Sequence, residues 1–209
     1  MKYWMVLWLA LATSALAAPR SQGQPGAFDF YVLSLSWSPT FCLTHPDNQQ
    51  CSGKGYGFVL HGLWPQYARG GWPASCAPQS ALSREALAKG DTLFVTRALL
   101  KHEWAKHGTC SGLEPLAYLE KTDAALGAVV IPPQLQPLNT PPSLEAREIE
   151  ALFRESNPRL GGHGLAVICK GKALSEVRVC LTKDLAFTGC PRSVKTQCRD
   201  GEIRIPSQR

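Results

Sequence analysis

The sequence predicts a single α+β domain in which helices flank a central, mainly antiparallel sheet and disulfides staple the fold. Two observations predict this class. Strand-like segments lie near both ends of the chain and helical segments lie between them, with no repeat or linker to divide the chain. All eight cysteines follow an amino-terminal stretch typical of an export signal, the pattern of disulfide-bonded proteins in oxidising compartments.

The amino-terminal residues have the features of a signal peptide. Lys2 gives a positive start, residues 4–12 are almost wholly apolar, and residues 15–17 have the small-x-small pattern of a cleavage site. We expect residues 1–17 to be the signal peptide and residues 18–209 to form the domain. The apolar run is short for a membrane span and no second one follows, so we expect no membrane association after signal removal. The expected location is secreted or bacterial periplasmic.

The net charge indicates the kind of partner that the protein binds. The formal net charge is +6, and removal of residues 1–17 takes away one lysine and no acid, which leaves +5. Such an excess favours polyanionic partners such as RNA.

Zinc ligation by the cysteines is the alternative to disulfides, but the irregular intervals contain no tight C-x-x-C pair. Spacing alone leaves the disulfide connectivity open.

The amino-terminal third predicts two strands and two loops. Apolar and polar residues alternate over residues 28–37, which predicts a strand. A polar loop lies between Cys42 and Cys51. Residues 56–60 predict a second strand that places His61 at its end, and the Gly-, Pro- and Trp-rich residues 66–78 predict a loop.

The middle of the chain predicts helices. A short helix is expected over residues 83–89 and a longer one over residues 93–107, with Gly108 ending it in a left-handed conformation. Residues 113–126 predict another helix. Between them, these segments supply the helical layer of the domain.

The last third begins with a proline-rich loop. Residues 131–142 contain five prolines and predict an extended surface loop. Ser143 is expected to cap an amphipathic helix that runs to about Ser156. Residues 164–169 and 174–181 predict two strands that finish in a cysteine-bearing hairpin region.

The segment KHEWAKHGTC, residues 101–110, gathers ionisable side chains on one helix face. Each residue of an α-helix turns by about 100°, so four of them share one arc while Trp104 and Ala105 project toward a core. The four are His102, Glu103, Lys106 and His107. A solvated surface is the simpler explanation of a charged face, but histidine is an uncommon choice for solubility alone.

A zinc-protease motif does not fit this helix. That motif needs two histidines four residues apart, whereas His102 and His107 are five apart. Lys106 would also oppose a cation. We therefore expect no metal site.

Two histidines, a lysine and a carboxylate suit RNA cleavage without a metal. RNA carries its own nucleophile, the 2′-hydroxyl, so cleavage needs a base to remove its proton and an acid to protonate the departing 5′-oxygen. Histidine titrates near neutrality and can serve as either. A fixed cation can stabilise the charge that collects on the pentacoordinate phosphorus.

HGLWP at residues 61–65 and HEWAKHGTC at residues 102–110 resemble the signature motifs of the ribonuclease T2 family of secreted, base-tolerant endoribonucleases. The order and separation of the motifs also fit, residues 28–42 resemble the family's opening strand, and the last cysteines resemble its C-terminal set. The resemblance implies that residues 18–209 are a ribonuclease domain. It also implies a monomer that acts on RNA without a cofactor and gives 2′,3′-cyclic phosphates, then 3′-phosphates.

The resemblance also implies roles for single residues. His61 and His107 would be the acid–base pair, with His107 the base. His102 would hold phosphate, while Glu103 and Lys106 would stabilise the transition state. For Glu103, a surface acid paired with Lys106 or His107 is the alternative.

The remaining implications concern base contacts and disulfides. Trp64 would face a base, with core packing as its alternative. Two departures from the family pattern affect base preference: Gln66 replaces an acid, and Leu99-Leu100 stands where relatives commonly carry an aromatic residue. By similarity, the disulfides would be Cys42–Cys51, Cys76–Cys110, Cys169–Cys198 and Cys180–Cys190.

The other tryptophans and histidines have simpler interpretations. We expect Trp37, Trp72 and Trp104 to be packing residues, and His45 and His163 to face solvent. Two further functional classes stay open: a non-catalytic RNA-binding or toxin-like protein on the same scaffold, and a disulfide-rich structural or interaction protein.

Overall fold

A mixed sheet brings together strands from both halves of the chain. The computed structural model describes residues 23–78, 81–136 and 140–207, so the predicted signal peptide lies outside the described residues and stays a prediction. The six strands of the sheet are β1 (Phe30–Trp37), β2 (Phe58–Gln66), β3 (Ser143–Glu145), β4 (Leu165–Lys170), β5 (Ala173–Leu181) and β6 (Glu202–Arg204).

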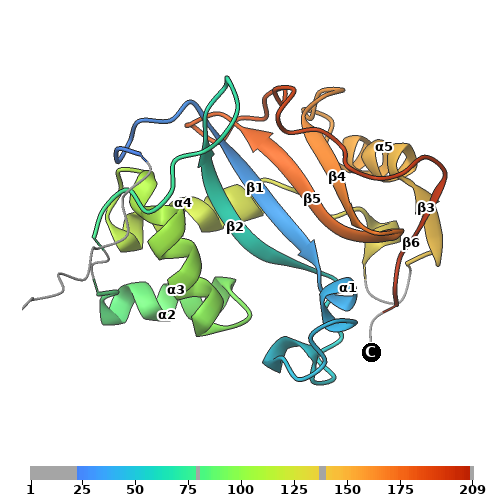
Figure 1. The fold of residues 1–209 in the computed structure, drawn as a ribbon, viewed down its shortest axis with the longest axis horizontal. Helices are drawn as coiled ribbons and strands as arrows, with labels where there is room; N and C mark the ends of the chain where they lie inside the picture. The colour runs from blue at the N-terminus through green and yellow to red at the C-terminus, as the bar shows by residue number, and fades with distance from the viewer. Residues whose placement is uncertain (1–22, 79–80, 137–139, 208–209) are drawn as a thin grey trace, which may run out of the picture.

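The pairing is antiparallel almost throughout. The strands lie in the order β2-β1-β5-β6-β3, and β4 also pairs with β5. Only the contact of β5 with β6, at Ala173 and Arg204, is parallel among these strands. Figure 1 shows β2, β1 and β5 as long neighbouring ribbons across the middle of the molecule. The predicted α+β class with a mainly antiparallel sheet is confirmed.

Alternation along the strands gives the sheet two different faces. Leu33 and Leu35 of β1 join Val177 and Val179 of β5 in the main hydrophobic core. The opposite face carries a smaller apolar cluster around Val32. That face remains available for polar side chains.

Helices pack mainly at the β2 side of the sheet. They are α1 (Ser38–Cys42), α2 (Arg84–Leu93), α3 (Arg97–Lys106), α4 (Pro115–Gly127) and α5 (Ala146–Ser156), with short 3₁₀ turns at Gln49–Cys51, Gly108–Cys110 and Pro133–Leu135. Figure 1 shows α2, α3 and α4 grouped beside β2, with α5 beside β4 and β3. Trp104 of α3 and Tyr118 of α4 both enter the main core, their rings 5.8 Å apart.

The predicted helix over residues 93–107 is wrong in its first turn. Helix α2 continues to Leu93, and α3 begins only at Arg97. Between them the chain is extended, which buries Phe94 in the core and lets the Thr96 hydroxyl accept a hydrogen bond from the Leu99 N–H at 3.1 Å. Burial of an aromatic ring and a favourable N-cap outweigh helical continuity here.

Gly108 does not end α3 in a left-handed conformation. It begins the 3₁₀ turn Gly108–Cys110 and is not among the residues with positive φ. A Cβ at this position would lie 2.3 Å from Cε3 of Trp104. Glycine is therefore required by close packing against the tryptophan and not by backbone dihedrals.

The start of the last helix also differs from the prediction. Ser143 belongs to strand β3, and Glu145 is the N-cap of α5. The Glu145 N–H donates to Glu148 Oε2 at 2.6 Å, and the two glutamates form a reciprocal capping box. The proline-rich segment before it lacks long elements, as expected, but Leu135 is fully buried in the core; residues 137–139 lie outside the described part.

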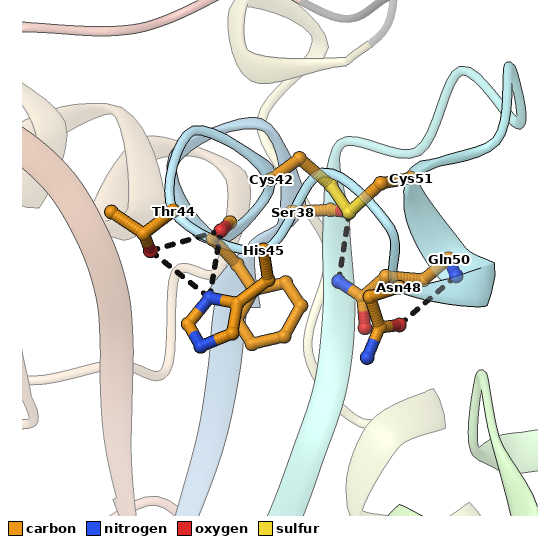
Figure 2. The surroundings of a disulfide bond; sticks show 8 residues. Ser38, Cys42, Thr44, His45, Asn48, Gln50 and Cys51 are labelled. Atoms are coloured by element: carbon orange, nitrogen blue, oxygen red, sulfur yellow. Dashed lines mark hydrogen bonds between the residues drawn. A yellow bond between two sulfur atoms is a disulfide. The ribbon is translucent and has the colours of Figure 1, made fainter.

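Four disulfides staple these elements, and they are the four pairings that the resemblance implies: Cys42–Cys51, Cys76–Cys110, Cys169–Cys198 and Cys180–Cys190. Figure 2 shows the loop closed by the first of them. There the Asn48 side chain accepts from the Gln50 N–H, and the Gln50 amide donates to Ser38 Oγ at 3.0 Å. In residues 23–78, 81–136 and 140–207, no helix has the length and apolar character needed to cross a bilayer.

Candidate active site

His61 lies in a bulge inside β2, and not at the end of a strand. Strand β2 runs on to Gln66, so the predicted strand end at residue 60 is wrong. Ser34 of β1 pairs with Gly62 and Leu35 pairs with Leu60, which leaves His61 as the extra, unpaired residue. A bulge bends the strand and re-aims one side chain. Here it directs His61 to the face of the sheet opposite the main core.

One cavity of about 250 Å³ collects every predicted catalytic and base-contacting side chain. Its lining includes His61, Trp64, Gln66, Trp72, His102, Glu103, Lys106, His107, Arg178 and Val194. The helix-face prediction for residues 102–107 is therefore correct in its geometry. Four larger hollows, of about 300, 430, 610 and 890 Å³, are lined by none of the predicted catalytic residues.

Glu103 is a buried acid that holds Trp64. Only 1% of the residue is exposed, so its interpretation as a surface acid is wrong. Trp64 Nε1 donates to Glu103 Oε2 at 2.6 Å, and Glu103 Oε1 lies 3.7 Å from His61 Nε2. Burial raises the pKa of Glu103, although the His61 charge and the Trp64 hydrogen bond oppose this shift.

His61 lies between two carboxylates. Its Nδ1 is 2.6 Å from Glu176 Oε1, while Glu103 faces its Nε2. Burial lowers the pKa of His61, but the hydrogen bond and charge of Glu176, with the charge of Glu103, outweigh it, so the pKa of His61 is raised. The site therefore favours the protonated imidazolium.

His107 has the opposite environment. It follows α3 directly, is only 5% exposed, and stacks on Trp64 with the ring centroids 5.2 Å apart. Within the described residues its buried Nδ1 has no hydrogen-bond partner. Burial, together with the charges of Lys106, His102 and His61, lowers the pKa of His107 to about 3. His107 is therefore a neutral imidazole near neutral pH.

Basic side chains line the cavity. His102 is exposed, and burial of part of the ring together with the Lys106 and His61 charges lowers the pKa of His102. Lys106 and Arg178 line the same cavity. Together they give the site an electrostatic preference for an anion.

Sequence reasoning missed Trp72 and Arg178, which line this cavity, and Glu176, which contacts His61. Trp72 was expected to pack internally, but 53% of it is exposed and it lines the cavity. Glu176 and Arg178 come from β5, far along the chain from the two motifs. The sequence contained a signal for these two residues: the strand is mostly apolar, and its two charges stand at alternate positions, which indicates one polar face.

The other tryptophans and histidines lie where expected. Trp37 and Trp104 are buried in the core, and His45 and His163 are exposed. In the part of the chain that the structure describes, no three or more His, Cys, Asp or Glu side chains are grouped so that they could hold a metal ion.

The fold and the cavity together define a disulfide-bonded α+β protein with a two-histidine, anion-favouring site. Comparison with known families gives the particular assignment: the chain belongs to the ribonuclease T2 family, whose model matches residues 28–190. The family resemblance of the two motifs is thereby confirmed.

Individual relatives agree with this assignment. The chain is 46% identical to a ribonuclease of Aeromonas hydrophila over 113 residues, 52% of this chain and 50% of that protein. It is 28% identical to a probable ribonuclease of Haemophilus influenzae over 185 residues, 81% of this chain and 63% of that protein. The matches thus span half and somewhat under two thirds of these two relatives. An RNase-related protein from Calystegia sepium superposes with a TM-score of 0.71 at 27% identity, covering 87% of this chain and 98% of that one.

Proposed function

We propose that this protein is a secreted or periplasmic, monomeric endoribonuclease that cleaves RNA by attack of the ribose 2′-hydroxyl, without a metal or cofactor. The products are 2′,3′-cyclic phosphates and then 3′-phosphates, with low base specificity. One observation carries the proposal: histidines from two chain segments line one cavity with their pKa values shifted in opposite directions. Such a split is what an acid–base pair requires.

His107 is suited to be the base. A base must be unprotonated, and the lowered pKa keeps its imidazole neutral. Its nitrogen accepts the 2′-hydroxyl proton as the oxygen attacks phosphorus. The positive charge that His107 gains lies against the Trp64 ring, whose π-face tolerates a cation.

His61 is suited to be the acid. Its raised pKa favours the protonated form, and its Nδ1 is held by Glu176, which leaves Nε2 to donate to the departing 5′-oxygen. In the second step the roles reverse: His61 takes a proton from water and His107 returns one to the 2′-oxygen. The pair is then ready for the next substrate.

The remaining charged residues suit the phosphate. Lys106 and His102 line the cavity and would hold the phosphate and offset the charge of the phosphorane. Glu103 accepts a hydrogen bond from Trp64 Nε1, and its other oxygen lies 3.7 Å from His61 Nε2. Its proposed contribution to the transition state is thus to hold Trp64 in place and to stabilise the protonated form of His61.

Tryptophan platforms support tolerance of different bases. Trp64 lies in the cavity wall beside both histidines, with the His61 ring 5.0 Å away, and Trp72 is largely exposed at the same cavity. Aromatic rings stack on any base, so they bind without strong sequence preference. The net charge of +6 and the four disulfides support a polyanionic substrate and an oxidising location.

The test is RNA cleavage in excess EDTA by wild type, His61→Ala and His107→Ala. We expect EDTA to have no effect and each substitution to cost at least about 100-fold in kcat, because a positioned acid or base contributes that much. His163→Ala, an exposed histidine outside the cavity, is the matched control and retains full activity.

Several results would contradict the proposal. Full activity in either cavity variant would exclude the pair, and cleavage lost in EDTA would exclude metal independence. Cleavage of a 2′-deoxy substrate, or absence of 2′,3′-cyclic ends early in the reaction, would exclude 2′-hydroxyl attack. Tight RNA binding with no cleavage by wild type would indicate a non-catalytic RNA-binding protein.

A further inference from the structure

We propose that Glu176 and Arg178 of β5 are positioning residues that fix the orientation and tautomer of His61 and couple it to Trp64. The inference rests on the proposed ribonuclease function, which it deepens by adding a second chain segment to the machinery. Neither residue belongs to the two motifs.

Strand register places this pair under His61. Glu176 pairs with Ser36 and Arg178 with Ser34, which in turn pairs with Gly62 beside the bulge. Positions two apart on a strand project to the same face, so both side chains lie on the face that carries the cavity. Glu176 is only 8% exposed, so a carboxylate has been buried here beside an imidazole.

The two oxygens of Glu176 have separate partners. Oε1 is 2.6 Å from His61 Nδ1, while Oε2 accepts from Arg178 Nε at 3.0 Å and Nη2 at 2.7 Å. Burial raises the pKa of Glu176, but the His61 hydrogen bond and the Arg178 charge outweigh this, so its pKa is lowered. An ionised carboxylate can only accept, so Nδ1 must carry a proton. The proton that His61 gives up in the reaction is therefore the one on Nε2.

Arg178 connects the acid histidine to the indole. Its guanidinium binds Glu176 and also lies 5.3 Å from the centroid of the Trp64 ring. Trp64 in turn stacks on His107. Arg178 thus contacts the partner of His61, which is Glu176, and the partner of His107, which is Trp64. An ion pair that served only solubility would not need these two contacts.

The charges around His61 come from two elements. On β5 they are Glu176 and Arg178; on α3 they are Glu103 and His102, and His107 directly follows α3. Because Glu103 remains in place, removal of the Glu176 charge should lower the pKa of His61 without abolishing its protonation. We therefore expect a measurable shift of the His61 pKa, while His61 still takes up a proton.

The experiment is titration of the His61 imidazole by NMR, alongside pH profiles of kcat and KM for cleavage of a dinucleotide. In Glu176→Gln, which keeps the shape and removes the charge, we expect the His61 pKa to fall by about one unit. The alkaline limb of the kcat profile should move to lower pH by the same amount. We expect kcat to fall about 10- to 100-fold, part of the contribution of a general acid, with little change in KM.

Two further variants separate positioning from general stability. Arg178→Lys keeps the charge and loses the two-pronged contact, so it should give a smaller fall in kcat than Glu176→Gln. Asp91→Asn removes a carboxylate from an exposed pair with Arg97, 2.6 Å apart, outside the cavity. This control should change neither the His61 pKa nor kcat.

The results distinguish this inference from the proposed function. An unchanged His61 pKa in folded Glu176→Gln would overturn the inference even if wild type cleaves RNA. A shifted pKa with an unchanged kcat profile would also overturn it. If wild type does not cleave RNA, the proposed function fails, and the NMR titration still tests the Glu176–His61 contact.

Discussion

At the scale of single residues, Gly62 determines how closely the parts of the site can approach. It lies next to the bulged His61, and a Cβ built there would be 2.1 Å from Glu103 Oε2 and 2.5 Å from Trp64 Nε1. The hydrogen bond between these two side chains passes directly over the glycine. Absence of a side chain at residue 62 is thus a requirement of the site, because real Cβ contacts are never that short.

Gly62→Ala should therefore disrupt the site more than the fold. We expect the methyl group to displace Glu103 and Trp64 and to lower kcat/KM by about 10- to 100-fold, the effect of a misplacement near 1 Å. Gly127→Ala is the matched control, since it ends helix α4 and, in the part of the chain that the structure describes, its Cβ position has no neighbour within 4 Å beyond the adjoining residues and the local helix backbone. Steady-state kinetics and thermal unfolding of both variants check this, and equal activity would contradict the role of Gly62.

At the scale of elements, the Cys76–Cys110 disulfide ties the loop after β2 to the turn after α3. Backbone contacts reinforce the junction: the Ser75 N–H donates to the Lys106 carbonyl at 2.8 Å, and the Cys76 N–H donates to Thr109 Oγ1 at 3.2 Å. The loop that follows the His61 strand is therefore fixed to the end of the helix that precedes His107.

Replacing Cys76 and Cys110 by serine should reduce both stability and activity. The bond closes a separation of 34 residues, for which chain entropy predicts a loss of about 4 kcal/mol in the free energy of unfolding. Activity should fall because His107 follows α3 at the end that the bond holds. Urea unfolding and RNA cleavage measure the two effects.

The Cys42–Cys51 pair provides the control for this prediction. It closes a separation of only 9 residues, in a loop outside the cavity, so its double serine variant should lose about 2–3 kcal/mol and retain activity. Loss of activity in this variant, or none in the Cys76–Cys110 variant, would refute the argument.

Elements with a clear local pattern were predictable, and those set by distant contacts were not. The alternation of β1 and β5 and the charged face of α3 are visible in the sequence. Strands β3 and β6, of 3 residues each, depend on pairing with each other and, for β6, with β5, all far apart in the sequence. The bulge at His61 likewise depends on its register with β1, and Glu176 reaches His61 across 115 positions.

At the scale of the whole molecule, the cavity shifts the pKa values of two histidines in opposite directions. His61 is held by carboxylates from β5 and α3, whereas His107 is surrounded by cations and buried without a hydrogen-bond partner for Nδ1 among the described residues. The two imidazoles therefore contribute to stability in different pH windows. His61, with its raised pKa, stabilises the fold fully below its unfolded pKa of 6.5, and this contribution is lost as the pH rises through its folded pKa.

His107 should make the molecule less stable in acid. Its pKa falls from 6.5 in the unfolded chain to about 3 in the fold, so between these values the unfolded state binds the additional proton. The free energy of unfolding must then decrease as the pH falls from 6.5 toward 3, with a slope of up to about 1.4 kcal/mol per pH unit from this residue. Urea unfolding at several pH values should show a shallower decrease in His107→Asn than in wild type. The exposed His163→Asn should follow wild type, and equal slopes in all three proteins would show that His107 is not buried in its neutral form.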